Sequence, residues 1–522
     1  MKRKGFTLIE LLAVIVILAI IALIATPIVL DIIEDSKNSS IKRSAELYLD
    51  AVEQAIATSA MNDGLEDGTY IIDSEGNLKY KDKTIKVDVK NYNFESGTVI
   101  IEQGQIKDIK LSNNEKVTTG KELNKIDKWD GKTVTEVMPD SNGIYHITKA
   151  SELAWVAQQV KNKKTFEGET ISLDASLDLG GRYDKDGKKL GTEWIPIGIK
   201  KSDTEELPFK GTFEGNNNVI SGVYINRTQD DLDENKHLGL FGYSDTAIIK
   251  SLVIKDFYIK GYSAIGGLIG RAKNNTNIDN IVASNIYIDT INSGGIIVGA
   301  TQTEVVLTNL YSYNSEIIGN GKYIGGVVGS LQIKCSLNNA YSNSIVKNNG
   351  TIRVAGVGGV VGFTYKQEIA ENLISEATVS GYSDVGGLIG QLQQGSTLKN
   401  SVSYAKVSGT NNIGGIVGIN SGEAGNTEIE NIRSYATIDG TGEYVGGMIG
   451  YACGDNTLIN LYSNSKIKGK DKVGKIIGGF RENFESKLNY KDLISESTIE
   501  GETNVGDLWG YINEKVTLNK LD

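Results

Sequence analysis

The sequence predicts a mainly β protein: a right-handed parallel β-helix of about ten coils, preceded by a long N-terminal helix and a small α+β head. Two observations point to the β-helix. A glycine-rich hexapeptide recurs about every 30 residues through the C-terminal part of the chain, which is typical of stacked supersecondary units. All 4 prolines precede Phe209, as expected where each later strand bonds to neighbours on both sides and proline cannot donate.

The chain begins with an apolar segment from Phe6 to Ala25, in which only Thr7 and Glu10 are polar. A helix of this length spans about 30 Å and could cross a bilayer. Basic residues precede the segment and acidic residues follow it, so we expect a single-pass precursor with its C-terminal region outside. A plain signal-anchor explains the apolar run but not Glu10, because a charge within hydrocarbon costs at least a few kcal/mol.

The segment Lys4-Gly5-Phe6-Thr7-Leu8-Ile9-Glu10 resembles the class III leader of type IV prepilins and of the related type II secretion pseudopilins. The resemblance implies that a prepilin peptidase cuts between Gly5 and Phe6 and that Phe6 is then N-methylated. It also implies that Glu10 pairs with the amino terminus of a neighbouring pilin subunit, so that Phe6 and Glu10 serve filament assembly. The implied location is the inner or cytoplasmic membrane for the precursor, and then the cell surface in a pilus built by the pilus assembly machinery.

Helical spacing continues behind this segment. The apolar positions are Ile33, Ile41, Ala45, Tyr48, Val52 and Ile56. They predict one buried helix face as far as about residue 61. From Thr69 to Leu111, short alternating runs divided by glycine-containing turns predict an antiparallel β-meander. The predicted divisions are a leader (1–5), the helix (6–61, with 6–26 spanning the membrane before assembly), the head (62–122), a linker (123–140), the solenoid start and cap (141–208) and the repeats (209–522).

The recurring hexapeptide is IGGLIG at its first occurrence. Copies begin at Ile265, Ile324, Val357, Val385, Ile413 and Val445, with weaker copies at Val473 and Val505. One copy alone could pass for a dinucleotide-binding loop, but such a loop occurs once and opens a helix. We therefore expect no cofactor. The repeats resemble the GLUG repeats of bacterial surface proteins over residues 141–522, which implies a surface module.

One asparagine occupies an equivalent position in each repeat. The column comprises Asn280, Asn309, Asn339, Asn372, Asn400, Asn431 and Asn460. Asparagine tolerates left-handed backbone, and its amide can bond along a stack of coils. We therefore predict a structural ladder, with a row that binds metal or sugar as the alternative. Tyr311, Tyr341 and Tyr462 share another repeated position and are candidate exposed rings for a ligand.

Other chemistry has weaker support. The net charge of −11 argues against a nucleic-acid partner, and no catalytic residues are identified. Asp184, Asp186 and Glu193 form a weak calcium candidate, but Arg182 stands where the first ligand should be, so a turn insertion is preferred and no metal is expected. The two cysteines fall about four coils apart, too far to bridge.

The sequence therefore predicts a type IV pilin-like filament subunit and not an enzyme. We expect a minor pilin that displays a β-solenoid adhesin for an unknown glycan or protein receptor, because several hundred residues of solenoid exceed what a filament shaft needs. Two alternatives stay open. One is a type II secretion pseudopilin, and the other is a filament-borne glycan lyase or hydrolase.

Overall fold

The computed structural model describes eight helical positions between residues 45 and 59 and most of residues 66–522. The gaps in the latter range are 74, 82, 88–93, 95, 103–104, 114–115, 120–127, 185–186, 201, 203–204, 352 and 354. Gly5, Phe6 and Glu10 lie outside the described residues. Within the described part of the chain, no helix is long and apolar enough to cross a membrane. The chain divides into two compact units, Met1–Ile126 and Asp127–Asp522.

The first unit contains a six-stranded antiparallel sheet. Its strands are β1 (Gly68–Ile72), β2 (Leu78–Tyr80), β3 (Lys83–Ile85), β4 (Ser96–Glu102), β5 (Gln105–Asn113) and β6 (Lys116–Thr119). They lie in the order β3-β2-β1-β4-β5-β6. The predicted simple meander is wrong, because β4 pairs with β1 and not with β3. The alternating pattern places Tyr70 and Ile72 of β1 in the core, but it cannot tell which sheet edge accepts the next strand.

A helix packs on this sheet through the face that the sequence spacing predicts. Ala45, Tyr48, Val52 and Ile56 are helical and at most 3% exposed. They share one apolar cluster with buried side chains of β1, β2, β4 and β5. The Tyr48 hydroxyl also donates to the carbonyl oxygen of Gly76, 2.6 Å away, in the turn after β1.

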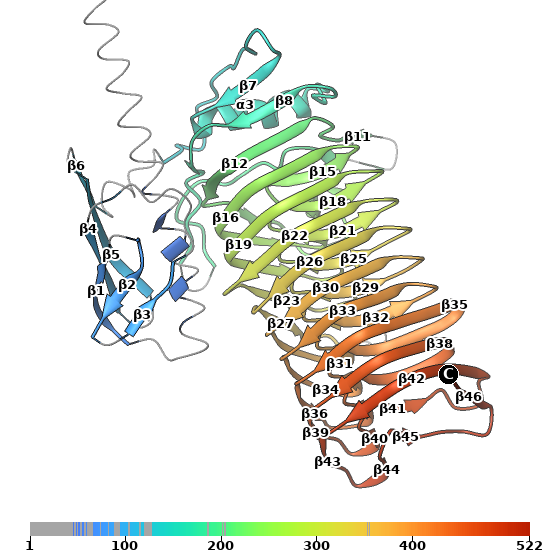
Figure 1. Cartoon of the computed structure of the whole chain (residues 1–522). Coiled ribbons are helices and arrows are strands. Elements are labelled where there is room, and N and C mark those ends of the chain that lie inside the picture. The colour runs from blue at the N-terminus through green and yellow to red at the C-terminus, as the bar shows by residue number, and fades with distance from the viewer. Residues whose placement is uncertain are drawn as a thin grey trace, which may run out of the picture. The chain divides into compact units, whose positions relative to one another are not determined.

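The second unit is a parallel β-solenoid (Figure 1). Its longest ladder comprises β7 (Ile144–Ile147), β8 (Thr170–Leu173), β12 (Thr212–Ser221), β16 (Ile248–Gly261), β19 (Asn277–Thr290), β22 (Val306–Tyr313), β26 (Ser336–Ser342), β30 (Ile369–Ser375), β33 (Thr397–Ser403), β35 (Val417–Ser434), β38 (Ile449–Ser463), β42 (Ser486–Ser495) and β46 (Val516–Lys520). The solenoid has about 13 turns, not about ten, because residues 141–208 contribute coils as well as a cap. Strand spacing gives a stack about 58 Å long. The predicted right-handed sense rests on the general preference of parallel crossovers.

Shorter strands complete each coil in three further ladders. One comprises β13 (Tyr224–Asn226), β23 (Glu316–Gly319), β27 (Ile345–Asn348), β31 (Thr378–Gly386), β34 (Lys406–Gly414), β36 (Thr437–Gly440), β39 (Lys466–Lys468) and β43 (Thr498–Glu500). The short strand β9 (Leu177–Asp178) pairs instead with the end of β12. The second comprises β14 (Lys236–Leu238), β17 (Ser263–Gly266), β20 (Gly294–Gly295), β24 (Ile324–Gly325), β28 (Val357–Gly358), β37 (Glu443–Gly446), β40 (Asp471–Gly474) and β44 (Thr503–Gly506). The third comprises β15 (Phe241–Asp245), β18 (Ile269–Lys273), β21 (Val298–Gln302), β25 (Val328–Leu331), β29 (Val361–Thr364), β32 (Ile389–Gln393), β41 (Ile477–Phe480) and β45 (Trp509–Tyr511). A short hairpin (β10, Ile199–Lys200; β11, Glu206–Leu207) and a 3-10 turn, η1 (Asp233–Asn235), project from the early coils.

One helix, α3 (Ala150–Lys161), lies beside β7 and β8 at the N-terminal end of the stack (Figure 1). Its start is fixed by Glu152, whose carboxylate accepts the backbone N–H of Lys149 at 3.0 Å. Leu153 and Val160 are fully buried and join the solenoid core. The helix thus covers apolar surface that the first coil would otherwise expose.

The apolar interior of the solenoid is a cluster of its own. It runs from Val137 to Leu488 and shares no described residue with the cluster of the first unit. A domain with a separate hydrophobic core can fold independently. The predicted linker contributes to this core, because Val137 is buried and Trp129 packs edge-on against Trp194 at 5.6 Å.

The glycine hexapeptides stack on one another. The structure shows two further copies that the repeat pattern in the sequence did not reveal. Gly294 pairs with Ile265 of the preceding coil and with Ile324 of the next, so the copy beginning there has glycine in place of the usual Ile or Val. Leu238 and Phe241 pair with Ile265 and Ile269, which makes this copy one residue shorter. These departures from the pattern hid both copies.

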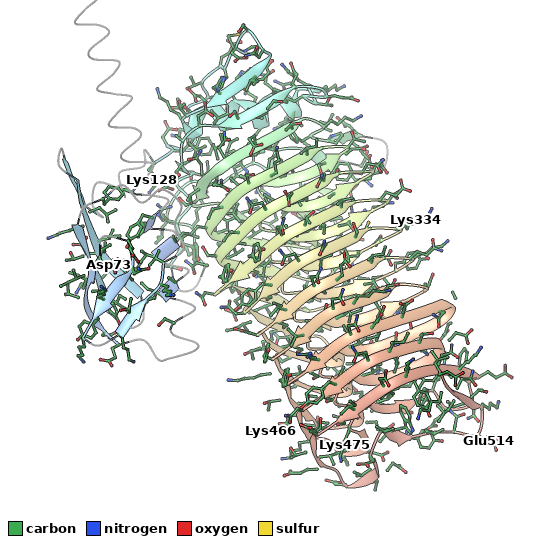
Figure 2. All side chains as sticks on the ribbon, in the orientation of Figure 1. Asp73, Lys128, Lys334, Lys466, Lys475 and Glu514 are labelled. Atoms are coloured by element: carbon green, nitrogen blue, oxygen red, sulfur yellow. The ribbon has the colours of Figure 1, made fainter. Side chains whose placement is uncertain are left out.

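The second glycine of the hexapeptide allows close packing of coils in most copies, whereas the copy that begins at Gly294 has Ile296 at this position. A Cβ at Gly387 would lie 2.0 Å from the carbonyl oxygen of Gly415 and 2.3 Å from the Oγ of Ser403. The same conflict with a carbonyl oxygen and a buried serine arises at Gly326, Gly359, Gly415 and Gly447. The repeated glycine and serine are therefore a packing pair and not a phosphate site. Lys475 takes this position at the C-terminal end (Figure 2) and pairs with Asp507 at 2.6 Å.

We expect Gly387→Ala to destabilise the solenoid by about 1–3 kcal/mol, because the added methyl group meets backbone that cannot move away without shifting a coil. Thermal or urea unfolding of the Asp127–Asp522 unit measures the loss. Lys475→Ala is the matched control: a Cβ is already present in that register, and the exposed ion pair is worth at most about 1 kcal/mol. Equal stability of Gly387→Ala and the parent would contradict the packing role.

Candidate functional site

The predicted asparagine column lies on the outer surface of the solenoid. All seven residues, from Asn280 to Asn460, have φ between 50° and 60°, the left-handed region that asparagine tolerates better than most residues. Each is exposed or half-exposed. Each therefore marks a bend at which the strand turns the next side chain back into the core.

The asparagine amides bond to side chains of neighbouring coils. Asn339 donates to the Oδ1 of Asn309 at 2.6 Å. Asn431 donates to Asn400 at 3.0 Å, and Asn460 donates to Asn431 at 2.8 Å. These bonds and the left-handed backbone are what a structural ladder requires.

A shallow groove of about 420 Å³ runs along this column. Five asparagines line it, Asn339, Asn372, Asn400, Asn431 and Asn460, together with Ile374, Ser401, Val402, Ile432, Arg433 and Tyr462. The exposed amides could also bind a polar ligand, since each retains acceptor or donor capacity beyond its ladder bond. The asparagine column can therefore form a structural ladder and also line a ligand site.

The tyrosines singled out from the sequence are half-exposed, and their hydroxyls are engaged between coils. The Tyr311 hydroxyl accepts the amide of Asn339 at 2.7 Å. Tyr341 donates to Glu376 at 2.8 Å, and Tyr462 donates to Glu496 at 2.6 Å. Burial together with the carboxylate of Glu376 raises the pKa of Tyr341. These three phenols therefore tie adjacent coils together.

The weak calcium candidate falls on a hairpin that projects between β9 and β10. The Asp184 carboxylate accepts the backbone N–H of Lys188 at 2.9 Å, which fastens the turn. The Glu193 carboxylate forms ion pairs with the basic side chains of Arg227 and Lys189. Asp186 lies outside the described residues, and the described residues contain no group of three or more potential metal ligands.

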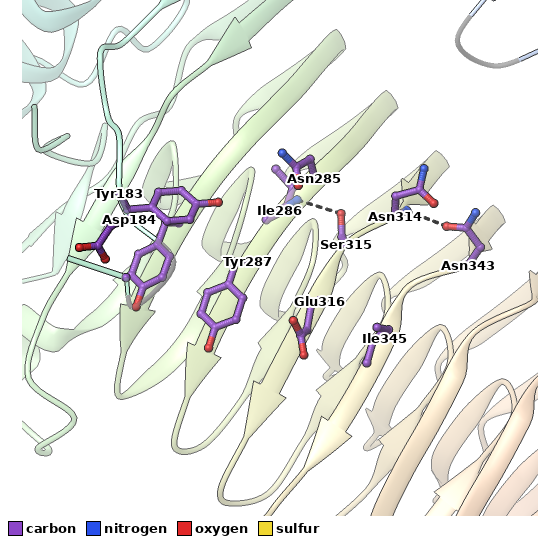
Figure 3. Close-up of a pocket in the computed structure, with 12 residues that line it drawn as sticks. Tyr183, Asp184, Asn285, Ile286, Tyr287, Asn314, Ser315, Glu316, Asn343 and Ile345 are labelled. Carbon is purple, nitrogen blue, oxygen red and sulfur yellow. Dashed lines mark hydrogen bonds between the residues drawn. The ribbon is translucent and has the colours of Figure 1, made fainter. Parts of the chain in front are cut away.

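A second groove, missed from the sequence, lies beside this hairpin (Figure 3) and encloses about 550 Å³. Its described lining comprises Tyr183, Asp184, Gly187, Tyr258, Asn285, Ile286, Tyr287, Asn314, Ser315, Glu316, Asn343 and Ile345. These residues come from the hairpin and from four successive coils. The volume is within the range of small-molecule sites, about 300–1,000 Å³.

Stacked tyrosines form one end of this groove. The rings of Tyr224 and Tyr258 lie 5.3 Å apart, and those of Tyr258 and Tyr287 lie 5.0 Å apart, both at 12°. Tyr183 packs on Tyr258 at 4.7 Å from the hairpin side. Burial raises the pKa of Tyr258 to about 12 and also raises that of Tyr287, so both remain neutral phenols at physiological pH.

The groove exists because the aromatic column stops. Tyr287 pairs in register with Glu316, which pairs with Ile345. These side chains are smaller than a tyrosine ring, so the surface steps down after Tyr287. The opposite wall is a second asparagine row, in which Asn285 and Asn314 have left-handed backbone. The signal in the sequence is an asparagine two residues before each of these column positions, in SNIY, YNSE and SNSI.

The chain is similar to known proteins over parts of its length. Residues 1–26 match the prokaryotic N-terminal methylation motif. The chain is 25% identical to an immunoglobulin A1 protease of Streptococcus sanguinis over 147 residues, which are 27% of this chain and 8% of that protein. It is 26% identical to halomucin of Haloquadratum walsbyi over 184 residues, 34% of this chain and 2% of that protein. The chain thus spans a small fraction of these relatives.

A crystal structure from Bacteroides ovatus, of a protein provisionally assigned as an immunoglobulin A1 protease, aligns with 73% of this chain and 85% of its own. The identity is 18% and the TM-score is 0.29.

The methylation motif implies processing by prepilin peptidase and pilus-type assembly. It also implies a membrane-anchored precursor that is exported to the cell surface or a filament.

We expect Asn400→Ala to lower the free energy of unfolding of the solenoid unit by about 1–2 kcal/mol, because alanine pays the left-handed penalty and loses the ladder bond. Asn400→Gly adopts φ of 50° without a Cβ penalty and should retain more of the stability. Chemical unfolding of both variants measures the difference. If glycine costs as much as alanine or more, backbone conformation is not the reason for asparagine at this position.

Proposed function

We propose that the chain is a type IV pilin-like filament subunit, a minor pilin that carries a GLUG-type β-solenoid as an adhesin. The observation that carries this proposal is the N-terminal methylation motif at residues 1–26 in the same chain as a solenoid of about 13 turns. The motif supplies the route to a surface filament, and the solenoid supplies far more surface than assembly requires. Cleavage falls between Gly5 and Phe6, and Glu10 neutralises the amino terminus of a neighbouring subunit.

Two properties of the solenoid support a role in recognition. Its described surface includes the two grooves of about 420 and 550 Å³, and ligand sites are generally concave. Its coils are closed by backbone packing and by ladders of polar side chains, so the surface is rigid without disulfides, and both cysteines are free and buried. A rigid surface loses little conformational entropy when it binds.

Two alternative functions, a secretion pseudopilin and a filament-borne glycan enzyme, would use the same leader. Experiments can distinguish each of them from an adhesin. A pseudopilin would act in secretion and leave attachment unchanged. An enzyme would release sugar fragments, which an adhesin does not.

Glu10→Ala should insert in the membrane and be cut after Gly5, since the substitution removes a costly charge from hydrocarbon. It should nevertheless enter filaments poorly, because the neighbouring amino terminus is left without its partner. Immunoblots of sheared filaments measure incorporation, and mass spectrometry of the membrane form checks that Phe6 is the methylated terminus. Normal incorporation, or assembled filaments that retain residues 1–5, would contradict the pilin assignment.

A chain that ends at Ile126 should still be processed but should no longer support attachment of cells to the surface that the parent strain colonises, because the adhesive part is missing. Adherent cells are counted for both strains. The purified Asp127–Asp522 unit, added in excess, should reduce attachment of the parent strain. Undiminished attachment of the truncated strain would favour the pseudopilin alternative.

A further inference from the structure

We propose that the groove of Figure 3 binds a neutral oligosaccharide, with Tyr287 as its stacking platform. The inference rests on the proposed function only for its setting, a solenoid displayed where it meets glycans. The binding site itself is argued from the groove.

The platform is the open face of Tyr287. One face of this ring is covered by Tyr258 at 5.0 Å and 12°. The next residue in the column is Glu316. Because Glu316 has no aromatic ring, no ring of a described residue stacks on the other face of Tyr287. Figure 3 places Tyr287 between the tyrosines of the hairpin side and Glu316. The flat apolar face of Tyr287 can pack against the C–H face of a pyranose ring, while the polar wall beside it can bond to the hydroxyl groups at the edge of the sugar.

Polar groups that a sugar could use lie on the floor and wall. The side chains of Asn314 and Glu316 make no hydrogen bond to a described residue, in contrast to the phenols of Tyr311, Tyr341 and Tyr462. An amide offers two donors and an acceptor, and a carboxylate accepts from hydroxyls. Other polar groups are used to hold the wall: Asn343 accepts the backbone N–H of Asn314 at 2.8 Å, and Ser315 accepts that of Ile286 at 3.0 Å.

The charge of the groove selects among sugars. Asp184 and Glu316 line it, and none of its described lining residues is basic. An acidic saccharide would bring like charges together in a partly desolvated site, which is unfavourable. A neutral chain meets no such penalty.

The dimensions favour an oligosaccharide over a single sugar. The lining spans the coils from Tyr258 to Ile345, about 14 Å along the solenoid axis at the usual strand spacing. Exposed Ile345, 48% accessible, closes the far end with an apolar surface. A chain lying along the axis would contact Tyr287 with one ring and Ile345 with another.

Isothermal titration of the Asp127–Asp522 unit with maltohexaose, cellohexaose, hexa-N-acetylchitohexaose and β-1,4-galactohexaose tests the inference. At least one should bind, and Tyr287→Ala should weaken it about tenfold or more. Asn314→Gly keeps the left-handed backbone and should weaken binding severalfold through the lost amide. Tyr404→Ala is the matched control, since Tyr404 is exposed and stacks on Tyr435 at 5.2 Å and 8° away from the groove; it should bind as the parent does. Sialyllactose and polygalacturonate should bind more weakly than the neutral chains.

Thermal melts of each variant separate loss of binding from loss of folding. Absence of binding by all four neutral hexasaccharides, or binding that survives both groove substitutions in folded protein, would overturn the inference. So would capture of a cationic peptide at Tyr287 in place of sugar. Leader cleavage and filament incorporation do not depend on the groove, so either of these failures leaves the proposed function standing.

Discussion

The close approach of neighbouring coils at the glycine hexapeptides is the constraint on which the solenoid depends. At Gly387 and its equivalents a side chain would meet the carbonyl oxygen of the next coil and the hydroxyl of a buried serine. Backbone contact at this corner fixes the distance between coils, so the apolar side chains of the longest ladder can stack directly over one another. The same spacing brings surface asparagines into hydrogen-bond contact and stacks the ring of Tyr258 on those of Tyr224 and Tyr287 at 12°.

The repeat pattern predicted much of the solenoid. Periodic glycine and asparagine and the absence of proline after Pro208 determine a stacked parallel fold, because each reports a local requirement of backbone or hydrogen bonding. The first coils escaped this reasoning because β7 and β8 are separated by α3 and carry no glycine hexapeptide. In the head, the buried helix face was readable from spacing, but the pairing of β4 with β1 was not, because edge choice depends on long-range packing.

The candidate groove could not be predicted in the same way. Tyr287 and Glu316 are 29 residues apart and acquire a relation only when consecutive coils align them. Tyr183 comes from a hairpin insertion outside the repeat, so the repeat period cannot predict its contact with Tyr258. The asparagine column was visible because it is regular, whereas the groove arises where regularity is interrupted. A ligand site built on a repeat scaffold is expected at such interruptions, since an unbroken column presents a uniform surface.

The stacking of coils also has a mechanical consequence. Strands of a β-solenoid run across the axis, so their hydrogen bonds point along it and resist extension directly, many in parallel at each interface. Each coil bonds only to its two neighbours, and no covalent cross-link joins coils, because Cys335 and Cys453 are buried free thiols. Tension applied at one coil therefore passes only through the coils between that point and the other attachment. Coils beyond the loaded segment carry no force and stay folded, so overload would peel the stack locally instead of rupturing it as a whole.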